Sequence, residues 1–153
     1  MSAPPSTYEP NLSTREEFAV SATALSKAPW KLAGAAGVAA TGADFLVHLP
    51  FHLFHPQIFT PLAMGAVAFF AVAGAGALIR TRHSRALRWA RRRPWRYAVA
   101  PGAACAIVVF ALMVVHGSGV GGSVFSALWH GALAYGATGV VGTMVRPRHG
   151  QRT

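Results

Sequence analysis

The chain has 153 residues, of which 53% are hydrophobic and only 12% charged, and it carries a formal net charge of +10. Because a soluble domain carries about a quarter charged residues, this composition excludes an ordinary soluble fold and favours a membrane protein over a nucleic-acid-binding module. The single cysteine, Cys105, excludes an intramolecular disulfide framework and a cysteine-rich metal site.

Residues 1–27 are polar and lack the apolar core of a targeting peptide, so we expect a cytoplasmic N-terminal tail. Within this tail, Ser13 and Glu16 fit the capping-box pattern that begins a helix, and a second such pattern overlaps it one residue later. Apolar residues follow with helical spacing over 18–25, which predicts a short helix lying on the membrane surface. Binding of this helix to a partner protein is the alternative.

Four apolar segments follow, and they predict a four-helix transmembrane domain at residues 28–146 with a basic cytoplasmic tail at 147–153. The predicted spans are residues 32–49, 58–79, 97–115 and 123–145. Each approaches the ~20 residues needed to cross a bilayer core of ~30 Å. The first span is the shortest and would gain reach if its helix continued past Pro50. The predicted fold class is therefore all-α, a polytopic membrane protein.

Small residues recur four positions apart in the second and fourth predicted spans. The pairs are Ala71 with Ala75, Ala73 with Ala77, Ala127 with Gly131, Ala132 with Gly136, and Thr138 with Gly142. Because small residues at this spacing let helix backbones approach closely, we expect a compact bundle that can also form a homo-oligomer or dock into a larger membrane complex. Pro101 is expected in the first turn of the third span, where proline is tolerated.

Basic residues divide the links between the spans into two kinds. The link at residues 80–96 holds eight arginines, whereas the links at 50–57 and 116–122 hold no lysine or arginine. By the positive-inside rule, both termini and the arginine-rich link face the cytoplasm of a prokaryotic plasma membrane. The arginines expected to contact anionic lipid head groups, rather than nucleic acid, are Arg85, Arg88, Arg91, Arg92 and Arg93.

The end of the first span carries a polar stripe in an otherwise apolar segment. Asp44 is the only aspartate in the chain, and His48, His52 and His55 follow it at intervals of four, four and three. Together with Thr41 they fall on one helix face, at the end that lies away from the arginines. Ionisable side chains within a membrane are costly unless something satisfies them, so this stripe is the main candidate site.

Two arrangements are open for the Asp44 carboxyl group. His130 lies at a similar depth in the fourth predicted span, so one hypothesis is an Asp44–His130 pair across the bundle. The alternative is a protonated Asp44 that hydrogen-bonds a backbone carbonyl or the Thr41 hydroxyl.

The spacing of the histidines also resembles that of metal ligands, because residues four apart on a helix can direct two imidazoles to one ion. The predicted ligands are His48, His52, His55, Asp44 and His130, with Met64, Met113 and His116 as further candidates. Imidazole with thioether favours copper, whereas imidazole with carboxylate suits zinc. Two alternatives stay open: the loop histidines are amphipathic interface residues, or His48 and His130 ligate a b-type haem from facing spans.

Three functions follow from these patterns. The first is an outward-facing Asp/His site that binds or transports a metal cation or a proton-coupled ligand. The second is a non-catalytic accessory subunit of a larger membrane assembly, and the third is a b-type haem membrane protein. No catalytic triad, phosphate-binding loop or dinucleotide motif is recognised, which disfavours an enzyme.

Overall fold

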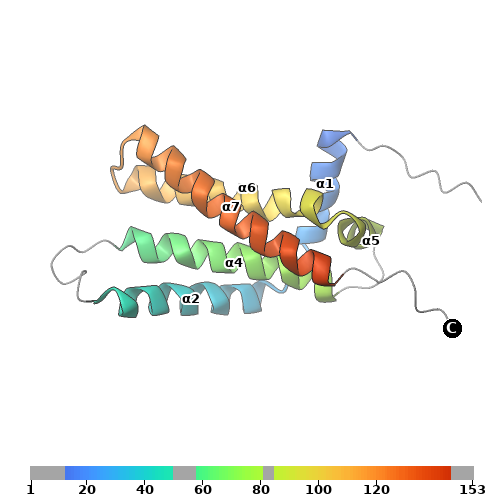
Figure 1. The fold of residues 1–153 in the computed structure, drawn as a ribbon, viewed down its shortest axis with the longest axis horizontal. Helices are drawn as coiled ribbons and strands as arrows, with labels where there is room; N and C mark the ends of the chain where they lie inside the picture. Colours follow the sequence, from blue (N-terminus) through green and yellow to red (C-terminus); the bar gives the residue numbers. More distant parts are fainter. Residues whose placement is uncertain (1–12, 50–57, 81–84, 146–153) are drawn as a thin grey trace, which may run out of the picture.

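The computed structural model describes residues 13–49, 58–80 and 85–145, and the regular elements of these ranges are six α-helices. They are α1 (Thr14–Leu25), α2 (Trp30–Val47), α4 (Phe59–Arg80), α5 (Arg85–Arg92), α6 (Pro94–Val115) and α7 (Val120–Met144), as Figure 1 shows. The predicted all-α class is confirmed.

Three of the described helices are long and apolar enough to cross a membrane: Phe59–Ile79 of α4, all of α6 and all of α7. The shortest of these segments has 21 residues, which at ~1.5 Å per residue gives a length of about 31 Å. The predicted first span is different. Helix α2 has 18 residues, or about 27 Å at the same rise, and it contains both Lys31 and Asp44. The structure therefore supports three candidate spans, one fewer than the four predicted.

Helix α4 is the centre of the arrangement (Figure 1). Helix α2 packs against one side of α4, and the antiparallel pair α6 and α7 packs against the other. Helices α1 and α5 lie at one end of the bundle, beside the start of α6. We call this the arginine end (α1, α5 and residues 93–96), and we call the opposite end, with His48, Phe59 and His116, the histidine end.

Glycine allows close backbone approach at two helix crossings. A Cβ on Gly37 of α2 would lie 3.1 Å from the carbonyl oxygen of Gly65 in α4, and a Cβ on Gly131 of α7 would lie 3.0 Å from that of Gly102 in α6. No larger side chain fits at these crossings without displacing the neighbouring helix. Of the small-residue pairs predicted from sequence, three are buried in helix contacts: Ala73 with Ala77, Ala127 with Gly131, and Thr138 with Gly142.

The position of Pro101 differs from the prediction. Helix α6 begins at Pro94, a place that suits proline, so Pro101 lies inside the helix rather than in its first turn. A proline there cannot donate the backbone hydrogen bond to the carbonyl four residues earlier, that of Tyr97. The Tyr97 hydroxyl, in turn, donates to the carbonyl oxygen of Gly74 at 3.1 Å and ties the first half of α6 to α4.

The arginine end is more ordered than its sequence suggests. The Ser13 capping box is formed, with the Ser13 backbone N–H donating to the Glu16 carboxylate at 2.8 Å. Helix α5, which was not predicted, forms within the arginine-rich link because Leu87 and Ala90 face inward and are buried. The next residue of α1, Glu17, pairs with both Arg93 and Arg96.

Candidate functional site

Asp44 and His48 form the polar end of α2. His48 is the C-cap of the helix, four residues after Asp44. Its Nδ1 lies 3.6 Å from Asp44 Oδ1 and 3.0 Å from the Asp44 backbone carbonyl oxygen. The shorter distance is within hydrogen-bond range and the longer one is not, so the ring is positioned by the carbonyl while its edge faces the carboxylate. A proton on Nδ1 places the lone pair on Nε2, the nitrogen through which a neutral imidazole can bind metal.

The two oxygens of the Asp44 carboxyl group are in different environments, with Oδ1 beside the His48 ring. Its side chain is 17% exposed, against 51% for His48. The second oxygen, Oδ2, is buried and has no hydrogen-bond partner among the described residues. Buried polar atoms are nearly always paired, and an unpaired one in an apolar environment is costly. In the described part of the chain, this oxygen is therefore the buried acceptor that a bound proton or cation would stabilise most clearly.

His130 does not complete the site in this structure. Its Nδ1 lies 2.7 Å from the Ser126 carbonyl oxygen and 3.3 Å from the Ser126 hydroxyl, one turn earlier on α7. The predicted Asp44–His130 pair is not formed, because α2 packs chiefly on one side of α4 and α7 on the other. The same separation leaves His48 and His130 on helices that do not face each other, as bis-histidine haem ligation would require.

The remaining predicted ligands are placed only in part. His52 and His55 lie outside the described residues. At the histidine end, the His116 ring packs against Phe59 with ring centroids 4.4 Å apart, and the Ser118 hydroxyl lies 4.0 Å from the sulfur of Met113. Met64 is partly buried in α4. Within residues 13–49, 58–80 and 85–145, no three His, Cys, Asp or Glu side chains gather as metal ligands would.

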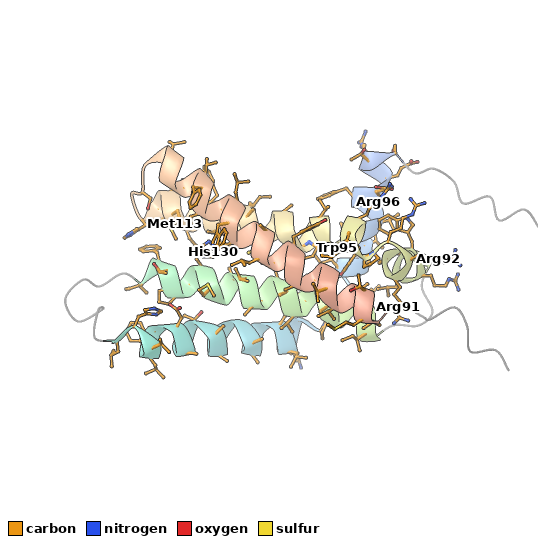
Figure 2. The ribbon with its side chains drawn as sticks, viewed as in Figure 1. Arg91, Arg92, Trp95, Arg96, Met113 and His130 are labelled. Carbon is orange, nitrogen blue, oxygen red and sulfur yellow. The ribbon has the colours of Figure 1, made fainter. Side chains whose placement is uncertain are left out.

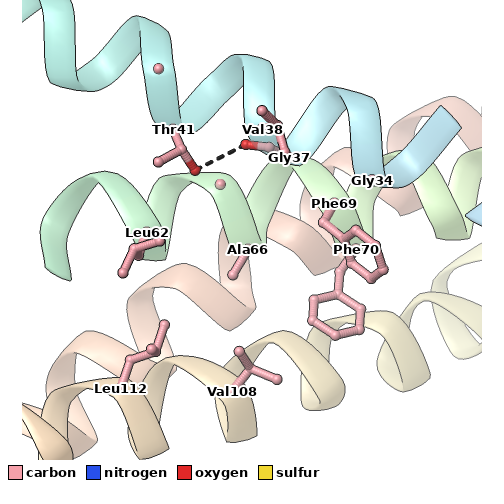
Figure 3. A pocket seen from close by; sticks show the side chains of 12 residues that line it. Gly34, Gly37, Val38, Thr41, Leu62, Ala66, Phe69, Phe70, Val108 and Leu112 are labelled. Atoms are coloured by element: carbon pink, nitrogen blue, oxygen red, sulfur yellow. Dashed lines mark hydrogen bonds between the residues drawn. The ribbon is translucent and has the colours of Figure 1, made fainter. Parts of the chain in front are cut away.

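An apolar groove lies beside this polar end, and sequence reasoning did not find it (Figure 3). It has a volume of about 720 Å³ and runs between α2 and α4, with Val108 and Leu112 of α6 forming its far wall. The Thr41 hydroxyl, one of its few polar groups, donates to the Gly37 carbonyl oxygen at 3.0 Å. The only signal in the sequence was the run of glycines in α2, whose effect depends on where α4 and α6 lie.

At the arginine end, the residues predicted to contact lipid fall into two groups. Arg91 donates from Nε to the Leu78 carbonyl oxygen at 2.7 Å and from Nη2 to that of Ile79 at 3.3 Å. Arg93 lies 3.3 Å from the Glu17 carboxylate. These two side chains therefore bind within the protein.

Arg88 and Arg92 are exposed on α5, and the side chain of Arg85 is outside the described part of the structure. Figure 2 shows Arg91, Arg92 and Arg96 at one end of the molecule, with Met113 and His130 toward the other.

Comparisons with protein-family models, with curated proteins and with solved structures found no match to this chain. The assignment of function therefore depends on the geometry of the site and on the distribution of charge.

Proposed function

We propose that this chain is a four-span integral protein of a prokaryotic plasma membrane, with both termini and the arginine end in the cytoplasm. Helices α4, α6 and α7 supply three spans. Helix α2 supplies the fourth: its 18 residues nearly match the ~30 Å bilayer core, and Lys31 sits at its arginine end, where its ammonium can reach the head groups. The charge asymmetry between the two ends supports this orientation.

The function that the geometry supports best is the binding of a cation at the outward, histidine end, as the first step of its capture or transport. Asp44 supplies the negative charge and His48 an imidazole nitrogen. The observation that carries this proposal is the buried Oδ2 of Asp44, which has no partner among the described residues. A bound zinc or copper ion would satisfy that oxygen, and a proton would do so when no metal is present. His52 and His55 follow in the chain and remain proposed further ligands.

The experiment is a metal-binding measurement on the full-length protein purified in mild detergent. Zn²⁺ and Cu²⁺ are added separately, and bound metal is measured by equilibrium dialysis and mass spectrometry. We expect binding of one ion per chain, lost in Asp44→Asn and in a His48/His52/His55 triple alanine variant. His83→Ala, which changes a histidine of the arginine-rich link, is the matched control and should bind as the parent does. Equal binding by the parent and the triple variant would overturn the proposal.

The second candidate is an accessory subunit that docks its helices into a larger assembly. One observation favours it: a Cβ on Gly136 of α7 would meet no atom within 4 Å, and Ala132 beside it is exposed, so this small-residue face is not used inside the bundle. A mild-detergent pull-down tests it. An accessory subunit should bind no metal and should co-purify with a larger membrane protein, and Gly136→Leu should release that protein.

A further inference from the structure

The apolar groove and the polar end of α2 lie on the same face of that helix. Thr41 lines the groove (Figure 3), and Asp44 and His48 follow it by three and seven residues. Residues at these spacings lie one above the other on a helix. At ~1.5 Å per residue, His48 is about 10 Å beyond Thr41 along the axis. Asp44 and His48 do not line the groove but follow its last lining residue on α2, Gly42. The groove therefore has apolar walls, and an acidic group lies just beyond it toward the histidine end.

The walls of the groove offer space but little hydrogen bonding. Gly34 and Gly42 line it, and a Cβ on either would meet no atom within 4 Å. The Thr41 hydroxyl already donates its hydrogen to the Gly37 carbonyl oxygen. Phe69 and Phe70, whose rings are edge to face with centroids 5.0 Å apart, close the groove toward the arginine end. A volume of about 720 Å³ is in the range of ~300–1,000 Å³ found for small-molecule sites.

We propose that the groove binds an amphiphilic organic cation, with its apolar body between α2, α4 and α6 and its positive group against Asp44. This inference rests on the proposed cation site and names a substrate class for it. A neutral apolar molecule would offer the Asp44 carboxyl group no charge to replace its proton, and the phosphate of a phospholipid would be repelled by the ionised carboxylate. A cation with an apolar body satisfies both parts of the site at once. Its aromatic groups would contact Phe69 and Phe70.

The test uses tetraphenylphosphonium, a lipophilic cation without hydrogen-bond donors. Binding of the radiolabelled probe to the full-length protein in mild detergent is measured by equilibrium dialysis, with Zn²⁺ binding measured in parallel on the same samples. The groove variants are Gly34→Leu and Gly42→Leu, at lining positions where an added Cβ meets no atom within 4 Å. The matched control is Gly122→Leu on α7, where an added Cβ also meets no atom within 4 Å but lies outside the groove.

We expect the parent and Gly122→Leu to bind the probe equally. Asp44→Asn should weaken probe binding by about tenfold, because it removes the charge that pairs with the cation. Gly34→Leu and Gly42→Leu should weaken probe binding by a similar factor while leaving Zn²⁺ binding unchanged, since neither changes Asp44 or His48.

Three results would overturn the inference. A parent that binds Zn²⁺ but not the probe would refute the organic ligand while the proposed metal site stands. Probe binding that is insensitive to Asp44→Asn, or to both groove variants, would place the probe elsewhere on the protein. A parent that binds neither cation would refute the proposed function and the inference together.

Discussion

Gly37 of α2 and Gly65 of α4 face each other backbone to backbone. A Cβ on Gly65 would lie 2.9 Å from the Gly37 carbonyl oxygen, and a Cβ on Gly37 would lie 3.1 Å from the Gly65 carbonyl oxygen. Because α2 packs chiefly on α4, this one crossing fixes how closely the two helices approach. It also fixes the shape of the groove that opens beside it.

Replacing Gly65 by leucine should therefore separate α2 from α4. The new side chain would collide with the Gly37 carbonyl and with Thr41, and overpacking of this kind costs about 1–3 kcal/mol. We expect a lower melting temperature for the purified protein in detergent. Gly42→Leu is the control, because an added Cβ there meets no atom within 4 Å. Equal stability of the two variants would show that the Gly37–Gly65 contact does not hold α2 in place.

Much of this fold could be predicted from the sequence, because hydrophobic length and turn signals are local. The predicted spans at 58–79, 97–115 and 123–145 each lie within or close to one long helix, and the Ser13 capping box forms as expected. The close approach of Gly37 and Gly65 could not be predicted, since those glycines lie 28 positions apart in the sequence. Helix α5 was missed for a related reason. A run of arginines looks like a solvated link until α1 and α4 cover Leu87 and Ala90.

Glu17 should anchor α1 to the start of α6. Its carboxylate pairs with Arg93 and Arg96, and its side chain is only 16% exposed. We expect Glu17→Gln to weaken the docking of α1 by about 1 kcal/mol, because two ion pairs are lost and one of them is partly shielded from solvent. Hydrogen exchange of the α1 backbone amides should become faster in this variant. Arg15→Gln changes an exposed charge on the same helix and should leave exchange unchanged. If both variants behave alike, these ion pairs do not anchor α1.

The first turn of α1 should depend on pH through Glu16. The Ser13 backbone N–H and, to a smaller degree, the Ser13 hydroxyl donate to this carboxylate and lower its pKa below 4.5. A pKa that is lower in the folded than in the unfolded state means that the capping box stabilises α1 above pH 4.5, and that this stabilisation is lost as the pH falls through the lowered pKa.

A carbon-13 NMR titration of the Glu16 carboxyl group in detergent measures this directly. We expect a midpoint below 4.5 in the parent protein. Ser13→Ala should keep most of the lowering, since the backbone N–H that contributes most is unchanged. A parent midpoint at or above the ordinary carboxyl value would contradict the capping box.

Arg91 should stabilise the end of α4 rather than bind lipid. Its guanidinium group donates to the Leu78 and Ile79 carbonyl oxygens, which lie in the last turn of that helix. We expect Arg91→Ala to destabilise the protein by about 1–2 kcal/mol and to speed amide exchange at the end of α4. Arg88→Ala, on the exposed face of α5, should leave that exchange unchanged and should weaken the binding of anionic lipid to the purified protein in detergent. If Arg91→Ala weakened lipid binding while Arg88→Ala sped exchange at the end of α4, the roles given to these two arginines would be wrong.

The candidate site was only partly accessible to sequence reasoning. The polar stripe on α2 follows from helical periodicity, so Asp44 and His48 could be identified and do lie together. The choice of His130 as a partner depended on depth alone. Depth along a helix says nothing about which helices are neighbours, and the Ser126 carbonyl one turn earlier on α7 was an available local partner. The groove depends on three helices at once, and no periodicity in a single segment reveals it.

The number of membrane crossings can be tested with single cysteines in a Cys105→Ala background. Lys27→Cys precedes α2 and Leu49→Cys follows it, and both positions are exposed. Arg88→Cys and Gly119→Cys flank α6 in the same way, at positions that are also exposed. If α2 spans the membrane, an impermeant maleimide should label Leu49→Cys and Gly119→Cys in intact cells, and the other two variants only after lysis. Each of α2 and α6 therefore lies between one variant that is labelled in intact cells and one that is labelled only after lysis.

One result would contradict a fourth span: Lys27→Cys and Leu49→Cys are labelled from the same side of the membrane. Arg88→Cys and Gly119→Cys would still be labelled from opposite sides. Helix α2 would then lie against the bundle without crossing, as its short length and its two charged residues would permit. Because α4 still crosses between positions 49 and 88, both Lys27→Cys and Leu49→Cys would then be labelled in intact cells, and Asp44 would lie in the outer interface rather than within a span. Because three helices already qualify as spans without α2, the accessibility of position 27 decides between a fourth span that carries the cation site and a helix that only covers α4.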